Sequence, residues 1–122
     1  MKSAAKQFVV QEHSRDGNVH WDLMLESGNI LRTWRLDTPP GNIGDEPVTA
    51  TKIFDHDLKF LTYEGPVNKG LGSVHIVDKG TLEILEENEK IIRLQFKGKI
   101  LSDNFMLERT ESEQWKLFKL TQ

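Results

Sequence analysis

The chain has 122 residues, a length that suits one domain built around one hydrophobic core. Hydrophobic residues make up 37% and charged residues 29%, a balance typical of a globular protein and not of a disordered or fibrous one. The formal net charge of −3 argues against a protein that coats nucleic acid through a strongly basic surface, but it allows binding of one phosphate group at a local positive site.

The sequence contains no cysteine, which excludes a disulfide framework, a thiolate zinc site and a cysteine nucleophile. Any metal must therefore be bound by nitrogen and oxygen ligands. The first ten residues lack an apolar stretch long enough for a signal peptide, and no window reaches the length of a membrane span. We expect a cytoplasmic monomer without a membrane partner, formed by a single domain over residues 1–122.

Alternation of apolar and polar residues with a period of two dominates the chain, in segments separated by turn signals. This pattern predicts a mainly β fold, a single compact antiparallel β-barrel of about eight strands. The predicted strands are residues 7–11, 18–26, 30–37, 48–54, 73–78, 81–85, 90–97, 99–109 and 114–120.

Glycine, asparagine and proline mark the connections between these strands. Asp16-Gly17 and Lys79-Gly80 supply residues that tolerate positive φ, so both are expected to be turns. One short helical turn is expected at residues 55–61, with Asp55 capping its first free amides. The glycine-containing residues 65–72 are expected to form a loop, and they lack the Lys-Ser/Thr of a phosphate-binding Walker loop. The acidic residues 83–89 are interpreted as a solvated hairpin tip.

Two histidines and one aspartate form the strongest chemical pattern. His20 and Asp22 are two residues apart on a predicted strand, so their side chains leave from the same face. If residues 14–19 form a hairpin connection, His13 at the end of the preceding strand comes to lie beside His20. Two imidazoles and one carboxylate suit Mn²⁺, Zn²⁺ or Fe²⁺ with positions left open for a substrate. Solvated strand faces show the same alternation, so the pattern alone leaves both interpretations open.

Other histidines and arginines offer weaker signals. His56 stands at the start of the predicted helical turn and is either a phosphate donor or general acid, or a surface histidine. His75 lies between apolar strand residues and is expected to be exposed. Arg32 and Arg35 must project to opposite faces of one strand, so only one of them can face a given site. A guanidinium binds phosphate with two hydrogen bonds, which makes such an arginine a candidate anion ligand.

Several short stretches occur in a defined order along the chain. They are Val10-Gln11-Glu12-His13, His20-Trp21-Asp22-Leu23-Met24-Leu25-Glu26, Trp34, Asp55-His56-Asp57-Leu58, Glu64-Gly65, Gly70-Leu71-Gly72 and Asp78-Lys79-Gly80-Thr81. In this order they resemble the 3′-phosphoesterase module of bacterial DNA ligase D. That family carries Val-x-Gln-Lys-His, His-Tyr-Asp-Phe-Arg-Leu-Glu, a central Trp, Asp-His-Pro-Leu, Glu-Gly, a glycine-rich turn and Asp-Arg-Gly-Thr.

The resemblance implies a compact β-barrel that removes 3′-phosphates and 3′-terminal ribonucleosides from DNA ends with the help of Mn²⁺. It makes His13, His20 and Asp22 the metal ligands, with Mn²⁺ as the cofactor and Zn²⁺ as the alternative. It makes Gln11 a nearby active-site amide and His56 the residue that contacts the phosphate or protonates the leaving oxygen. The implied partners are nucleic-acid 3′ ends, and a DNA ligase or polymerase acting in trans.

Among the departures from the family pattern, Met24 stands where the family has an active-site arginine, and Phe60 where it has a tyrosine. The connection between the histidines is also one residue longer, and the family's tyrosine before the glycine turn and its lysine after the Trp strand are missing. Because loss of a bidentate arginine weakens phosphoryl chemistry, we expect Arg35 or Arg15 to bind the phosphate instead. The leading interpretation is a metal-dependent phosphoesterase acting on nucleic-acid 3′ ends in DNA repair. One alternative is a non-catalytic metal-containing module that binds phosphorylated ends or a repair partner. Another is a metal-free polar face used for protein contacts.

Overall fold

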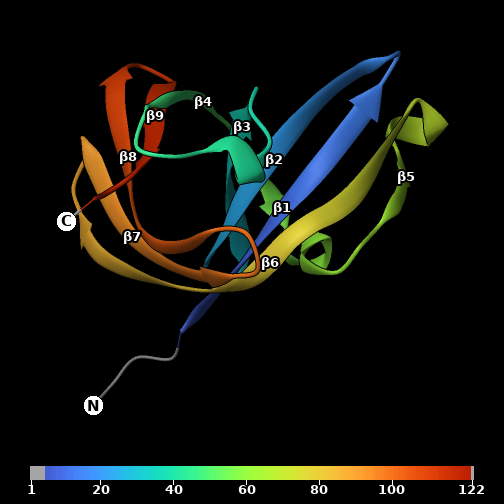
Figure 1. The fold of residues 1–122 in the computed structure, drawn as a ribbon. Helices are drawn as coiled ribbons and strands as arrows, with labels where there is room; N and C mark the ends of the chain where they lie inside the picture. Colours follow the sequence, from blue (N-terminus) through green and yellow to red (C-terminus); the bar gives the residue numbers. More distant parts are fainter. Residues whose placement is uncertain (1–4, 122) are drawn as a thin grey trace.

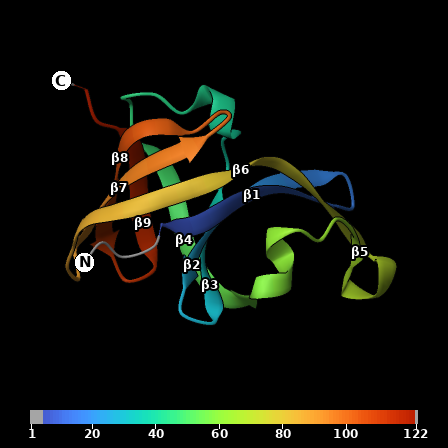
Figure 2. The same cartoon turned by 90° about the horizontal axis from the view of Figure 1, so that it is seen from below.

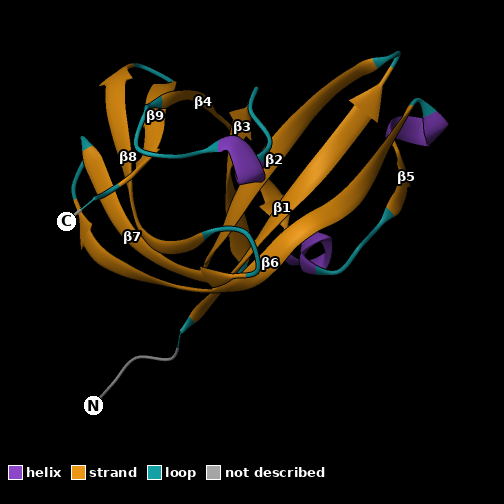
Figure 3. Cartoon of the chain, viewed as in Figure 1, coloured by secondary structure: helices purple, strands orange, loops and turns teal. Residues whose placement is uncertain are grey.

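The computed structural model of the chain describes residues 5–121, so the first four residues of the segment considered above for a signal peptide lie outside it. Strands account for most of the described chain, and three short 3₁₀ turns interrupt them (Figures 1 and 3). The strands are β1 (Lys6–Arg15), β2 (Asn18–Ser27), β3 (Ile30–Leu36), β4 (Val48–Asp57), β5 (Gly65–Val67), β6 (Gly72–Glu87), β7 (Ile91–Gly98), β8 (Ser102–Glu111) and β9 (Gln114–Lys119). The turns are η1 (Pro40–Asn42), η2 (Leu58–Leu61) and η3 (Asn68–Gly70).

The strands form one antiparallel sheet in the order β1-β2-β3-β4-β9-β8-β7-β6-β5. Because β1 also pairs with β6, the sheet closes on itself as a ring, and β5 adds to the free edge of β6. The predicted fold class, mainly β and antiparallel, is confirmed. Within residues 5–121, no helix is long and apolar enough to cross a membrane.

The connection between β1 and β2 is a two-residue turn, shorter than the predicted residues 14–19. Asp16 and Gly17 both have positive φ, at 52° and 78°, which is the conformation that a tight antiparallel hairpin requires. The strands therefore stay paired as far as Arg15 opposite Asn18. This tight hairpin fixes the register of both strands along their whole length.

The predicted turn at Lys79-Gly80 is wrong, because β6 runs through it as one strand of 16 residues. Gly80 is required there by close packing between strands and not by a turn. A Cβ atom at this position would lie 2.1 Å from the carbonyl oxygen of Lys97 on β7, so only glycine permits the two strands to approach this closely. A long-range contact, and not a local turn, explains the glycine.

The predicted helical turn at residues 55–61 is reduced to the four residues of η2. Pairing with β3 continues as far as Asp57, opposite Ile30, and keeps residues 55–57 in β4. The cap is accordingly Asp57 and not Asp55, and its carboxylate accepts a hydrogen bond from the Lys59 amide at 2.9 Å. Residues 85–89 of the acidic segment are exposed, as predicted for a solvated hairpin tip.

Two hydrophobic clusters lie on opposite faces of β1, β2 and β3. The larger cluster fills the ring and takes side chains from almost every strand, among them Phe8, Leu23 and Trp34. The smaller one, around Val9 and Met24, lies on the outer face. The chain from η2 to β5 runs beside β1 and away from β7, β8 and β9 (Figure 2). The outer face of β1 to β3 is therefore partly covered, and the polar residues on it lie in a recess.

Candidate metal centre

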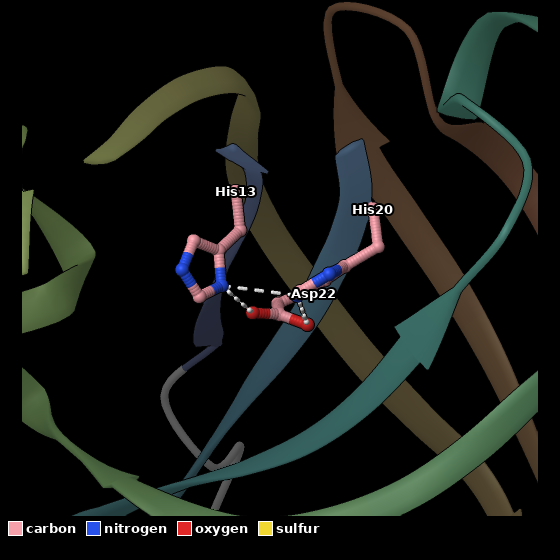
Figure 4. A group of neighbouring side chains, drawn as sticks. All are labelled: His13, His20 and Asp22. Atoms are coloured by element: carbon pink, nitrogen blue, oxygen red, sulfur yellow. Dashed lines mark hydrogen bonds and ion pairs between the residues drawn. The ribbon is translucent and has the colours of Figure 1, made fainter. Parts of the chain in front are cut away.

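His13, His20 and Asp22 converge on the outer face of β1 and β2 (Figure 4). The hairpin register sets His13 directly opposite His20 and Gln11 directly opposite Asp22. The Nδ1 atom of His13 lies 3.0 Å from Nε2 of His20. Asp22 approaches both rings, with Oδ1 3.4 Å from Nε2 of His20 and Oδ2 3.9 Å from Nδ1 of His13. The structure thus brings the three predicted ligands to one point.

The 3.0 Å and 3.4 Å separations suit ligand atoms that share one ion, and the 3.9 Å separation corresponds to a wider angle at that ion. Two ligand atoms each about 2.1 Å from a metal lie about 3.0 Å apart at a right angle and about 3.4 Å apart at the tetrahedral angle. Asp22 is only 3% exposed, and its Oδ1 atom accepts no hydrogen bond from any residue in the described part of the chain. A buried carboxylate oxygen without a hydrogen bond is costly, and a cation would remove that cost. The donor set therefore fits a divalent metal.

His13 is suited to act as a neutral ligand. Burial lowers the pKa of its ring below the usual value, and the neighbouring His20 lowers it further, so a lone pair is available at neutral pH. Nδ1 of His13 and Nε2 of His20 are the ring atoms that face the shared point, so they are the atoms able to bind an ion there. Gly72 on β6 makes room for the His13 ring, because a Cβ atom there would lie 3.0 Å from its Nε2.

The cluster opens into a pocket of about 370 Å³ between the sheet and the segment from η2 to η3. Arg35 and Arg15 both reach this pocket. The Nε atom of Arg35 lies 3.7 Å from Oδ1 of Asp22, and its side chain is 41% exposed. Arg15 pairs with Asp16 across 3.7 Å at the exposed end of β1. The pocket is lined by Gln11, His13, Arg15, Asp22, Met24, Arg35, Phe54, His56, Phe60, Val67, Asn68 and Val74.

His56 enters the same pocket from β4 and has a defined tautomer. Thr33 donates its hydroxyl hydrogen to the Leu31 carbonyl at 3.1 Å, so its oxygen is left to accept from Nδ1 of His56 at 2.9 Å. The Phe54 carbonyl, 3.1 Å away, also accepts from Nδ1. Nδ1 therefore carries a proton, and Nε2 of the neutral ring is the atom free to exchange one. Burial lowers the pKa of His56, which favours this neutral form.

Gln11 is fully buried and holds the covering segment in place. Its Nε2 atom donates to the carbonyls of Phe60 at 2.9 Å and Tyr63 at 2.8 Å, which ties η2 to β1. Its Oε1 atom is buried without a hydrogen-bond partner in residues 5–121. The amide nitrogen is thus already used by the fold, and only the oxygen is left to face a ligand.

The chain is similar in sequence to known proteins over most of its length. Residues 11–109 match the family model described as the DNA Ligase D 3′-phosphoesterase domain. The chain belongs to this family. It is 30% identical, over 93% of its length, to the multifunctional non-homologous end joining protein LigD of Mycobacterium bovis and to the corresponding DNA repair protein LigD of Mycobacterium tuberculosis. The chain spans about 16% of the length of these relatives. The resemblance inferred from the sequence is confirmed.

Within the phosphoesterase family pattern, the departures at Met24 and Phe60 lie on one apolar wall of the pocket. Met24 is buried in the outer cluster, and Phe60 packs against that cluster. Both positions therefore contribute apolar surface where the family pattern has an arginine and a tyrosine. Cationic groups reach the pocket instead from Arg35 on β3 and Arg15 at the end of β1.

Two further residues of this phosphoesterase-type site were not identified from the sequence. Thr33 is two residues before Arg35 on the same strand face, so alternation alone would have placed it beside the site. Phe54 is the last residue of a predicted strand, directly before the predicted helical turn, and nothing local shows that β4 continues past it. His75, in contrast, is exposed as predicted and pairs with Glu64 at 2.9 Å, outside the pocket.

Proposed function

We propose that the protein is a metal-dependent phosphoesterase that processes nucleic-acid 3′ ends in DNA repair, by removing a 3′-phosphate or a 3′-terminal ribonucleoside. The observation that carries the proposal is the buried carboxylate of Asp22, whose Oδ1 atom lies 3.4 Å from Nε2 of His20 and has no hydrogen-bond partner in the described chain. Membership of the family supports the reaction class. Two imidazoles and one carboxylate suit Mn²⁺, Zn²⁺ or Fe²⁺, and the family resemblance makes Mn²⁺ the proposed ion, with Zn²⁺ as the alternative.

His13, His20 and Asp22 would hold the ion, which would supply Lewis-acid chemistry at a phosphate oxygen and make a neighbouring water more acidic. Arg35 and Arg15 bind the remaining phosphate oxygens as fixed positive charges. His56 exchanges the proton through Nε2, because Thr33 and the Phe54 carbonyl occupy Nδ1. As a neutral ring it accepts a proton from the attacking water, while the leaving 3′ oxygen, on the opposite side of phosphorus, takes its proton from solvent water.

The substrate in this proposal is a nucleic-acid end, and the product is a free 3′-hydroxyl. A polymerase or a ligase uses such an end, so a separate enzyme of either class acting in trans is the proposed partner. The much longer relatives are named for several functions in end joining, which supports a place in the same process.

Phosphate release from a 3′-phosphorylated primer strand in the presence of Mn²⁺ tests this function. We expect turnover by the wild type, loss of turnover in His20→Ala, and a drop of roughly 10²–10³-fold in Arg35→Gln if this arginine binds the phosphate. Arg32→Gln is the matched control, because Arg32 pairs with Glu87 at 2.9 Å and lies outside the pocket. Absence of turnover with Mn²⁺ and with Zn²⁺ would contradict a phosphoesterase.

A second function is favoured by the apolar wall of Met24 and Phe60. If the pocket lacks the groups needed to stabilise the transition state, the same metal cluster would bind phosphorylated ends or a repair partner without hydrolysing them. Tight, metal-dependent binding of a 3′-phosphorylated strand by the wild type, with the phosphate left intact, would support this module. Loss of that binding in His20→Ala would show that the metal cluster is responsible.

A further inference from the structure

Phe54 is an exposed aromatic residue at the mouth of the pocket. Its side chain is 72% exposed, and within residues 5–121 it is the only aromatic among the exposed large hydrophobic residues. It lies in a bulge of β4, where the pairing with β3 shifts between Leu31 and Thr33. A bulge redirects the side chains of the strand that contains it, and here it leaves an aromatic ring in solvent beside the metal cluster.

The ring of Phe54 is held in a fixed orientation. It stacks on His56, with ring centroids 4.7 Å apart and planes inclined by 16°. His56 is itself fixed by Thr33 and meets the ring of Phe60 edge to face at 5.6 Å. One face of Phe54 is therefore covered by His56, and the opposite face remains available. A rigid ring with one free face can stack on a flat ligand at little entropic cost.

We propose that Phe54 is a stacking platform for the base of the 3′-terminal nucleotide. This inference rests on the proposed function of the same pocket, and it adds that the substrate is recognised through its terminal base as well as its phosphate. The pocket combines two anion-binding guanidinium groups with one exposed aromatic ring, and a nucleotide presents the matching pair of a phosphate and a flat base. Every base has a π face, so we expect discrimination between base and no base, and little between the four bases.

The decisive substrates are two DNA strands that end in the same 3′-phosphate. One carries a base on its terminal nucleoside, and the other carries an abasic deoxyribose there. For the wild type with Mn²⁺ we expect KM to be at least about fivefold lower for the strand with the base. Phe54→Leu keeps an apolar side chain but removes the ring, so the difference should nearly vanish. Phe54→Trp should keep it, and Leu85→Ala, an exposed apolar site outside the pocket, is the control for surface change.

Equal KM values for both strands in the wild type would overturn the platform. So would an equal loss on both strands in Phe54→Leu, because it would mean that Phe54 acts only by packing on His56. Binding is measured separately, without added metal, as the quenching of a 2-aminopurine placed at the terminal nucleoside. Quenching by the wild type and not by Phe54→Leu supports the platform even if no phosphate is released, which would contradict the proposed hydrolysis alone. Absence of quenching by the wild type overturns the platform.

Discussion

Two aspartates of this chain, Asp22 and Asp78, are equally buried but differ in the hydrogen bonds that their carboxylates accept. Each is 3% exposed on a strand. The two oxygens of Asp78 accept hydrogen bonds from the next amide along β6 and from three amides in the connection between β7 and β8, at distances between 2.7 and 3.1 Å. The donors are the amides of Lys79, Lys99, Ile100 and Leu101. Asp22 has imidazole and guanidinium groups nearby, but its Oδ1 atom accepts no hydrogen bond from the described residues.

The difference separates a structural carboxylate from a candidate ligand. A charge that accepts several backbone hydrogen bonds stabilises the native state and has little capacity left for anything else. A charge that is buried and only partly paired destabilises the native state until a cation arrives. In the sequence both residues are simply aspartates within strands, so the hydrogen-bond partners, and not the burial, tell them apart.

The largest expected effect on stability comes from the structural carboxylate, Asp78. Asp78→Ala leaves several amides without an acceptor, and we expect the free energy of unfolding to fall by about 3–4 kcal/mol. Urea denaturation followed by circular dichroism measures this free energy. Mn²⁺ should stabilise the variant by the same amount as it stabilises the wild type. A loss below about 1 kcal/mol would mean that water replaces the carboxylate and that Asp78 is not structural.

Asp22→Asn should behave in the opposite way. Without metal, in EDTA, we expect the free energy of unfolding to stay within about 1 kcal/mol of the wild type, because the charge that is removed was poorly paired. In Mn²⁺ at about 100 times its dissociation constant, the wild type should gain about 2.7 kcal/mol and the variant should gain almost nothing. Thermal unfolding with and without Mn²⁺ reads out both effects. Equal metal stabilisation of both proteins would remove Asp22 from the ligand set.

Gly72→Ala should have a smaller effect, which separates the stability of the fold from its affinity for Mn²⁺. The added Cβ atom would lie 3.0 Å from Nε2 of His13 and 3.1 Å from the Ser14 carbonyl oxygen, so the ring and the adjoining end of β1 must both shift by a few tenths of an ångström. We expect a loss of stability below about 1 kcal/mol and a roughly tenfold weaker affinity for Mn²⁺, because the position of a ligating ring tunes its metal. Gly44→Ala is the matched control, since nothing lies within 4 Å of its added Cβ atom. Unchanged Mn²⁺ affinity, measured by titration calorimetry, would contradict a ligating His13.

The sequence predicted those parts of the site that depend on local rules. His20 and Asp22 share a face because strand side chains alternate, and His13 meets His20 because Asp16-Gly17 makes a tight hairpin. The parts that failed depend on contacts between distant segments. Gly80 looks like a turn residue until Lys97 of β7 is placed against it.

The same limit applies to Phe54 and to the extra strand β5. Pairing with β3 keeps the residues after Phe54 in β4, although their apolar spacing resembles a helix. β5 exists because residues 65–67 reach the free edge of β6, which no local pattern reveals. Tertiary pairing therefore overrides local preference at the positions that cover the pocket.

The smallest expected effect concerns His56 and pH. Burial lowers the pKa of His56 in the folded state, so the unfolded chain binds the proton first as the pH falls. Stability is therefore full above the ordinary histidine pKa of about 6.5 and is lost as the pH falls toward the lower folded value, by about 1.4 kcal/mol for each pH unit between the two. His56→Asn keeps a side-chain donor near Thr33 but removes the titration.

The wild type should therefore lose more stability than His56→Asn between pH 7.5 and 5, measured by urea denaturation in EDTA so that metal release does not contribute. His75→Asn is the matched control, because His75 is exposed, pairs with Glu64 and lies outside the pocket. Between pH 7.5 and 5, His75→Asn should lose nearly as much stability as the wild type, whereas His56→Asn should lose less. If all three proteins lose stability equally on acidification, His56 is not held neutral by its surroundings, and its role as the first acceptor of the proton from water fails with it.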